Sequence, residues 1–387
     1  MSFRLTSRLL AAVSAAVLMA GVPAASAAAS PGWAQPGYGP GHNFYNPSES
    51  VINAASLSKL KQRWATKLPA IEDYSCSKPA TPLAVGGRVF VSDETGIGAY
   101  QAGTGRKLWH HTFRNPEDET TPHLAVAGNL LVAGNSDCQS QSDPNGGIVA
   151  LDVVTGKQKW AVGASGPVAS MVVDQGMVMV AGSSSSTEPA VRAFRLSDGK
   201  KRWTASGYES AGVSAAGRVL VSRDPGVAAL SVATGKRLWG KPNAWTAVAA
   251  TPAGDVFYVA DAKGGLSALT AATGAVRWSS KVSGGLVAAD GKRIFRTVFH
   301  GVEALDAKTG KRSWLAYLGQ PVDQPVRAGG LLYAGVGDES IAVLNAATGK
   351  RTYFEAGPYN PGGSSHVVLA DGRLYQVAEG VLRAYAP

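Results

Sequence analysis

The stretch ALDVVTGKQKW, residues 150–160, recurs with small changes along most of this 387-residue chain and decides its fold. Clear copies read ALSVATGKRLW (229–239), ALTAATGAVRW (268–278), ALDAKTGKRSW (304–314) and VLNAATGKRTY (343–353), and weaker copies begin at residues 53, 99 and 193. The last residue of each copy is aromatic, and successive aromatics are 36 to 51 residues apart. A period of about 40 residues with strand-like content is typical of a propeller built from repeated blades.

Each repeat divides into four short strands separated by turn residues. In the repeat from residue 80 to 113, alternating apolar residues predict strands, and Gly86-Gly87 supplies a two-residue hairpin turn. Asp290-Gly291 and the recurring Thr-Gly steps do the same elsewhere. No stretch has helical periodicity, so we expect an all-β fold of four-stranded antiparallel blades.

The two ends of the chain predict how the ring closes. After Tyr353 the sequence supplies three strands and then stops, whereas the N-terminal stretch LKQRWATKL (60–68) supplies a single outer strand with none before it. Pairing them completes an eighth blade and removes open sheet edges. The sequence therefore predicts an eight-bladed β-propeller closed by an N-terminal outer strand and three C-terminal strands.

The aromatic that ends each repeat has a structural role in this interpretation. On an outermost strand it covers the apolar gap to the next blade, burying roughly 150–250 Å². The expected blade-sealing residues are Trp64, Trp109, Trp160, Trp203, Trp239, Trp278, Trp314 and Tyr353.

Residues 1–28 have the pattern of a cleaved signal peptide: Arg4 and Arg8, then an apolar run, then small residues. A membrane anchor is the alternative, but the apolar run is short and is followed by Pro23. Residues 29–50 are rich in Gly, Pro and Ser and predict an extended arm, and residues 51–387 form the propeller. We expect a secreted or wall-associated monomer with no membrane-spanning segment after the leader.

The formal charge is +10, and lysines and arginines gather directly before the repeated aromatic, as in GKQK, GKKR and GKRS. The repeat spreads these residues around the molecule, so they predict a basic rim and no nucleic-acid groove. Such a rim either contacts anionic wall polymer or lipid head groups or serves solubility alone. The two cysteines, Cys76 and Cys138, form an even pair in an exported chain and predict a disulfide, with no spacing that suggests a metal site.

The phrase GxxxALDxxTGKxxW, together with GHNFYNPSES (41–50) and LSKLKQRW (57–64), resembles the pyrroloquinoline-quinone-like (PQQ-like) repeat family. The resemblance covers nearly all of the chain after the leader and implies an eight-bladed propeller. It implies two functional classes: quinoprotein alcohol and glucose dehydrogenases, and non-catalytic proteins such as the propeller lipoprotein of the outer-membrane barrel-assembly machinery.

This sequence departs from the dehydrogenase pattern. Many such enzymes carry adjacent cysteines against the cofactor, whereas Cys76 and Cys138 are 62 residues apart. Their calcium-binding residues and catalytic aspartate match no motif here. We therefore expect no cofactor. Binding of PQQ with calcium is implied by the family resemblance alone.

Long loops are expected on the face where second strands lead to third strands and fourth strands lead to the next blade. Four of them, at 68–80, 115–122, 135–147 and 183–189, belong to the first three blades, and the first and third carry the two cysteines. Candidate ligand-binding residues on this face are Tyr74, His123, Tyr208, Arg223, Trp245, His300 and His366. The acidic run 117–119 is interpreted as a solvated loop, and no catalytic residue is assigned.

The sequence thus predicts a secreted, non-enzymatic scaffold that binds a protein, a peptide or a cell-wall polymer on its loop-rich face. The alternative is a PQQ-dependent oxidoreductase that acts on alcohols or sugars.

Overall fold

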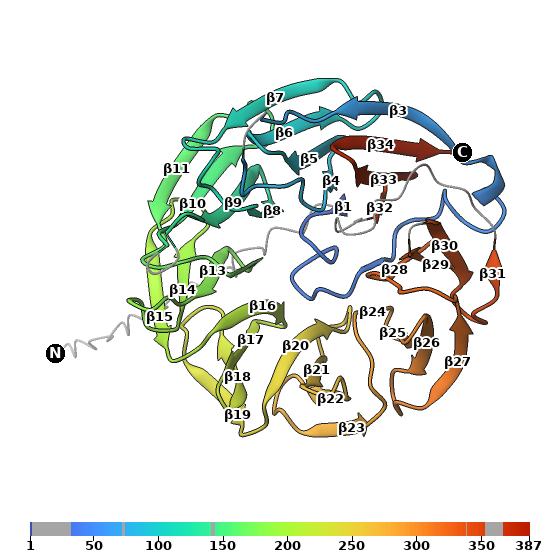
Figure 1. Cartoon of the computed structure of the whole chain (residues 1–387). Helices are drawn as coiled ribbons and strands as arrows, with labels where there is room; N and C mark the ends of the chain where they lie inside the picture. The colour runs from blue at the N-terminus through green and yellow to red at the C-terminus, as the bar shows by residue number, and fades with distance from the viewer. Residues whose placement is uncertain (2–31, 72–73, 141–143, 338, 353–366) are drawn as a thin grey trace.

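The predicted architecture is confirmed. The computed structural model, which describes Met1 and residues 32–71, 74–140, 144–337, 339–352 and 367–387, is a closed ring of eight antiparallel blades (Figure 1). The described residues contain a single short 3₁₀ turn, η1 (Leu57–Lys59), and are otherwise strands and connections. The leader, Tyr353 and His366 lie outside the described residues.

Each of blades 1 to 4 uses four consecutive strands, the first nearest the ring centre. They are β4 (Leu83–Val85), β5 (Arg88–Ser92), β6 (Gly96–Gln101) and β7 (Lys107–Thr112) in blade 1; β8 (His123–Ala127), β9 (Leu130–Ser136), β10 (Gly146–Asp152) and β11 (Gln158–Gly163) in blade 2; β12 (Ser170–Asp174), β13 (Met177–Gly182), β14 (Ala190–Arg195) and β15 (Lys201–Ser206) in blade 3; and β16 (Ser210–Ala215), β17 (Arg218–Arg223), β18 (Gly226–Ser231) and β19 (Arg237–Lys241) in blade 4.

Blades 5 to 7 repeat this order, and blade 8 combines both ends of the chain. They are β20 (Trp245–Ala250), β21 (Val256–Asp261), β22 (Leu266–Thr270) and β23 (Val276–Ser280) in blade 5; β24 (Val287–Ala289), β25 (Arg293–Val298), β26 (Gly301–Asp306) and β27 (Arg312–Tyr317) in blade 6; β28 (Val326–Ala328), β29 (Leu331–Val336), β30 (Glu339–Asn345) and β31 (Arg351–Thr352) in blade 7; and β32 (Val367–Ala370), β33 (Arg373–Ala378), β34 (Val381–Ala386) and β3 (Lys61–Lys67) in blade 8.

Blade 8 is closed as the sequence predicts. The outer strand β3 pairs antiparallel with β34, with Lys61 opposite Ala386 and Lys67 opposite Val381. Figure 1 shows the C-terminus beside β3. Because the first strand of the ring and the last are neighbours in one sheet, separation of the ends requires the rupture of a whole strand pair.

The ring has two distinct faces. On the loop face, second strands lead to third strands and outer strands lead to the next blade. On the turn face lie the tight turns between first and second strands and between third and fourth strands. Gly86 and Gly87, with φ of 59° and 72°, confirm the left-handed turn geometry expected between β4 and β5.

The repeated tryptophans join neighbouring blades by a common contact. Each indole Nε1 donates a hydrogen bond of 2.9–3.2 Å to a backbone carbonyl of the following blade: Trp64 to Ala102, Trp109 to Val153, Trp160 to Leu196, Trp203 to Val232, Trp239 to Ala271, Trp278 to Ala307 and Trp314 to Ala346. The ring also covers the glycine of the following blade's Thr-Gly or Asp-Gly turn. A Cβ on Gly199 would come within 2.7 Å of the Trp160 ring.

The N-terminal arm runs through the centre of the ring, inside the innermost strands (Figure 1). Its strand β1 (Gly32–Trp33) pairs with β4 of blade 1, and β2 (Tyr45–Asn46) pairs parallel with β28 of blade 7. Between and beyond these strands the arm bonds to the other blades in chain order, with one partner in each innermost strand: Ala34 with Val126, Gln35 with Val173, Pro40 with Ser214, Gly41 with Ala250, Asn43 with Ala289 and Asn46 with Leu369.

The arm therefore crosses the centre of the ring and is bonded to the innermost strands near their turn-face ends. Trp33 is completely buried, and its ring centroid lies 5.6 Å from that of Tyr38 and 6.4 Å from that of Phe44. These aromatic side chains give the otherwise Gly- and Pro-rich arm an apolar core of its own, which packs against blades 1, 7 and 8.

Candidate functional site

A disulfide between Cys76 and Cys138 pins the loop face above blades 1 and 2, as the sequence predicts. Their Cα atoms are 6.3 Å apart, and the bridge joins the segment before β4 to the loop between β9 and β10. A structural disulfide is typical of a compartment outside the reducing cytosol.

The acidic residues beside this bridge hold the loops together. The Asp118 carboxylate accepts the backbone N–H groups of Cys138, at 3.0 Å, and of Gln139, at 2.7 Å. The Glu119 carboxylate accepts the Asn135 amide at 2.8 Å. Because both carboxylates accept hydrogen bonds from within the loops, this cluster stabilises the shape of the face.

An exposed row of aromatic rings crosses the loop face of blade 6. Phe299, 81% exposed, stacks on His300 with ring centroids 3.9 Å apart, and Tyr317, 68% exposed, follows at 6.3 Å from His300. Phe299 and His300 form the turn between β25 and β26, and Tyr317 ends β27. We call Phe299, His300 and Tyr317 the aromatic row.

The backbone beneath the aromatic row is firmly held. His300 has a φ of 52°, a left-handed conformation that is uncommon for a residue with a side chain. Its carbonyl accepts the N–H groups of Leu318, at 2.7 Å, and of Gly319, at 3.2 Å, at the end of β27. The turn and the outer strand are therefore fixed to one another.

A buried ion pair supports the same blade. Arg296 and Glu303 face one another on β25 and β26, with side chains 1% and 2% exposed, and Arg296 Nε donates to Glu303 Oε1 at 3.0 Å. Arg296 Nη1 also donates to the Val282 carbonyl at 2.9 Å, which ties the incoming loop to the blade. This loop presents Val282 and Leu286, 53% and 49% exposed, and the Leu286 carbonyl accepts the N–H of Thr297, two residues before Phe299.

The structure does not bring the sequence-predicted ligand residues together. Among the described residues, no hydrogen bond, ion pair or ring contact joins two of the six candidates that the structure describes. Tyr208 is buried, Trp245 is half-buried at the start of β20, and Arg223 and Tyr74 are exposed. Of this set only His300 belongs to a larger exposed cluster, and its neighbours Phe299 and Tyr317 carried no distinguishing sequence signal.

His123 instead lies near the arm. Burial lowers the pKa of His123, an effect that a hydrogen bond with the Ala169 backbone partly offsets. Burial also lowers the pKa of His42 in the arm to about 4, and the electrostatic influence of His123 adds to this shift. Both imidazoles are therefore neutral near pH 7 and serve as part of the packed centre.

A second buried pair lies in blade 1. Asp93 is completely buried, and its carboxylate contacts His110 Nε2 at 2.9 Å and Thr95 Oγ1 at 2.7 Å. Burial raises the pKa of Asp93, but the hydrogen bonds from His110 and Thr95 outweigh this effect and leave it lowered. The hydroxyl of Thr112 lies 3.5 Å from His110 Nδ1. The contacts of Asp93 with Thr95 and His110 hold the turn between β5 and β6.

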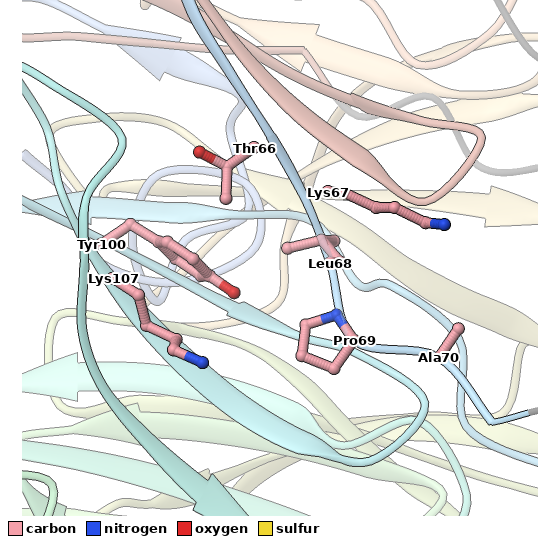
Figure 2. Close-up of a pocket in the computed structure, with 7 residues that line it drawn as sticks. All are labelled: Thr66, Lys67, Leu68, Pro69, Ala70, Tyr100 and Lys107. Carbon is pink, nitrogen blue, oxygen red and sulfur yellow. The ribbon is translucent and has the colours of Figure 1, made fainter.

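Two shallow cavities lie in grooves between blades. The first, of about 400 Å³, is lined by Lys67, Leu68, Pro69, Tyr100 and Lys107 between blades 8 and 1, and Figure 2 shows the Tyr100 hydroxyl and the Lys107 amine pointing to the same side of it. The second, of about 310 Å³, lies between blades 2 and 3 beside Phe194 and Lys201. Neither contains a convergent set of catalytic groups.

The outer edge of the turn face is basic. Exposed cations follow the turn between the third and fourth strands in blades 1 to 7: Arg106, Lys107, Lys157, Lys159, Lys200, Lys201, Arg202, Lys236, Arg237, Arg277, Lys308, Lys311, Arg312, Lys350 and Arg351. We call this set the basic rim. Exposed apolar residues interrupt it at Val154, Leu238 and Val276, which are 56%, 49% and 50% exposed.

Within the residues that the structure describes, no group of three or more His, Cys, Asp or Glu side chains is arranged to hold a metal ion. The same residues include no helix with the length and apolarity needed to cross a bilayer.

Comparisons with known proteins agree with this architecture. Residues 93–226 and 223–384 match the family model described as outer membrane protein assembly factor BamB. The BamB of Yersinia pestis is 24% identical over 381 residues, which cover 89% of this chain and 95% of that protein.

Two solved structures show the same fold. BamB from Moraxella catarrhalis superposes with a TM-score of 0.62 at 18% identity, over 85% of this chain and 98% of that one. The quinohemoprotein alcohol dehydrogenase from Comamonas testosteroni superposes with a TM-score of 0.69 at 14% identity, over 93% and 81% of the two chains. Because the family model matches well over half of the sequence, this chain belongs to the PQQ-like β-propeller family represented by BamB.

Proposed function

We propose that this chain is an exported, non-enzymatic scaffold that binds a protein partner on its loop face, and that the aromatic row on blade 6 is the anchor of that contact. The observation that carries the proposal is the exposure of Phe299 and Tyr317 on a backbone that is already held in place. Aromatic side chains of this kind dominate the energetics of protein interfaces.

Rigidity supports a binding role. The Arg296–Glu303 pair and the Thr297 hydrogen bonds to Leu286, at 2.9 and 3.0 Å, fix the loop that flanks the row. A partner that docks here orders few additional side chains, so less binding free energy is lost to conformational entropy. Val282 and Leu286 extend the apolar contact beyond the rings.

The name of the Yersinia pestis relative supports a protein partner, because that protein is described as an assembly factor for outer membrane proteins. The disulfide supports export, and the N-terminal pattern of residues 1–28 supplies a route through a cleaved signal peptide. A peptide or wall-polymer ligand is the less favoured form of the same proposal, since the row is apolar and the loops of blades 1 and 2 are acidic.

The proposal is tested with the purified chain as bait for the extracellular fraction of the producing cells. Stoichiometric retention of one protein by the native chain, lost in Phe299→Ala/Tyr317→Ala and kept in the turn-face control Leu238→Ala/Val276→Ala, supports it. Equal retention by both variants contradicts the assignment of the row.

A quinone-dependent oxidoreductase remains the alternative because a quinohemoprotein shares the fold. The residues present do not favour it. The arm crosses the centre of the ring, the cysteines are not adjacent, and the described part offers no cluster of metal-ligating side chains. Addition of PQQ and calcium, followed by spectroscopy and dye reduction with alcohols or sugars, tests this; saturable binding with turnover would reverse our choice.

A further inference from the structure

We propose that the turn face is a docking surface for an anionic phospholipid membrane. The proposal concerns the face opposite the aromatic row and does not depend on the protein partner. It rests on two properties of one edge of the ring: the repeated cations of the basic rim and the exposed apolar residues among them.

The repeat determines the geometry of the rim. Each blade places its cations at the same point, directly after the turn between the third and fourth strands, as with Lys157, Lys236 and Lys311. The blades form a closed ring (Figure 1), so the turns that carry these cations recur around the ring on its turn face. A flat anionic surface can approach many blades at once. Each lysine or arginine near such a surface contributes about 1 kcal/mol, an attraction that declines within a Debye length.

The acidic residues of the same turns do not cancel the rim. Asp152 Oδ1 accepts the backbone N–H groups of Val154 and Thr155, each at 3.0 Å, and Asp306 makes the equivalent bonds to Lys308 and Thr309. Of the rim cations, Lys159 pairs with Asp152 at 3.4 Å and Arg277 pairs with Asp255 at 3.1 Å. Three of the seven turns carry a carboxylate, at Asp152, Asp198 and Asp306, so the fifteen cations of the basic rim outnumber them.

Charge also orients the molecule. The loop face carries the acidic residues Glu117, Asp118, Glu119 and Asp137 beside the disulfide. An anionic surface attracts the turn face and repels this part of the loop face. Docking by the turn face leaves the aromatic row directed away from the membrane.

The exposed apolar residues of the rim favour a membrane over a soluble polyanion as its ligand. Val154, Leu238 and Val276 come from blades 2, 4 and 5 and are about half exposed among the cations. A polyanionic polymer gains nothing from these side chains, whereas a bilayer accepts apolar side chains at the boundary between head groups and acyl chains. Cations with interspersed apolar residues are typical of a surface that binds membranes peripherally. This pattern favours a lipid bilayer as the ligand of the turn face.

The test is sedimentation of the full chain with phosphatidylcholine vesicles that contain phosphatidylglycerol. We expect binding that added salt weakens, and none to phosphatidylcholine alone. The turn-face variant Lys236→Glu/Lys311→Glu should bind at least about tenfold more weakly. The matched loop-face variant Lys263→Glu/Lys281→Glu, with the same change in net charge, should bind as the native chain does.

A second pair of measurements tests the apolar contribution. Leu238→Ser/Val276→Ser keeps every cation and should weaken vesicle binding severalfold while leaving binding to soluble dextran sulfate unchanged. Thermal melting of each variant shows that the fold is kept. Equal losses in both charge-reversal variants, or binding to dextran sulfate without binding to vesicles, would overturn the proposal.

Discussion

The indole of Trp160 covers Gly199 of the next blade and at the same time donates a hydrogen bond of 2.9 Å to the Leu196 carbonyl in the same turn. The repeated phrase is therefore not a self-contained unit. Its tryptophan and its glycine belong to two different contacts, one with the following blade and one with the preceding blade.

The Gly199→Ala substitution should destabilise the protein by about 2 to 4 kcal/mol. Its φ of 68° costs about 1 kcal/mol for a residue with a Cβ, and the contact with Trp160 adds an overpacking term. The control is Gly176→Ala, because Gly176 has a φ of 74° and an added Cβ there would meet no atom within 4 Å, so only the backbone cost should remain. Urea unfolding gives the free energy of unfolding of both variants. An equal loss of stability in the two would contradict the packing explanation.

The Gln35→Ala substitution should loosen the arm. The Gln35 amide donates to the Val173 carbonyl at 2.7 Å and accepts the Val173 N–H at 2.9 Å, both in a buried setting. Loss of both partners leaves two buried backbone groups unpaired, at a cost of about 1 to 3 kcal/mol for each group. The hydrogen-exchange rate of the Val173 amide and the free energy of unfolding measure the effect of the lost hydrogen bonds. The exposed Gln158→Ala should change neither, and an unchanged Val173 exchange rate in Gln35→Ala would disprove the contact.

The buried ion pair of blade 6 should respond asymmetrically to mutation. Arg296→Met leaves the buried Glu303 carboxylate with only the more distant Arg312 guanidinium, at 3.9 Å, and should cost about 3 to 5 kcal/mol. Arg296→Met/Glu303→Leu removes both charges and should recover most of that loss. Denaturant unfolding of the single and double variants measures the difference; a double variant no more stable than the single one would show that the pair is not the cause.

The low pKa of His42 in the arm predicts that the folded protein loses stability in mild acid. The folded-state pKa of His42 is about 4, below the ordinary value of 6.5, so between these values the unfolded chain binds a proton that the folded chain does not. Above pH 6.5 His42 is neutral in both states and does not lower the free energy of unfolding. As the pH falls towards 4, protonation of the unfolded chain lowers the free energy of unfolding by about 2 to 3 kcal/mol. His42→Gln should flatten this part of the profile of unfolding free energy against pH. An identical slope in the variant would refute the assignment to His42.

The fold was predictable because the repeat encodes local contacts. Turn glycines and the outer tryptophan recur at each blade, and the unequal ends of the sequence indicate closure through β3. The disulfide followed from the same topology, since both cysteines fall in loops that emerge on one face and the structure bridges them.

The candidate site was much less predictable. The path of the arm depends on backbone partners in different blades, and a Gly- and Pro-rich segment carries no periodicity that would indicate them. Phe299 and His300 occupy a two-residue turn that sequence alone does not show to be exposed. Arg296 and Glu303 are seven residues apart, and only the register of β25 and β26 makes them partners.

The route of the arm also has a consequence for the order of events during folding. Asn46 reaches Leu369 across 323 residues, and Lys61 in β3 pairs with Ala386. The arm and β3 therefore cannot complete these contacts until the chain has been synthesised as far as Ala386. The arm and the eighth blade therefore reach their final structure only after the strands of the other blades have been synthesised. Closure of the ring is a late step in folding.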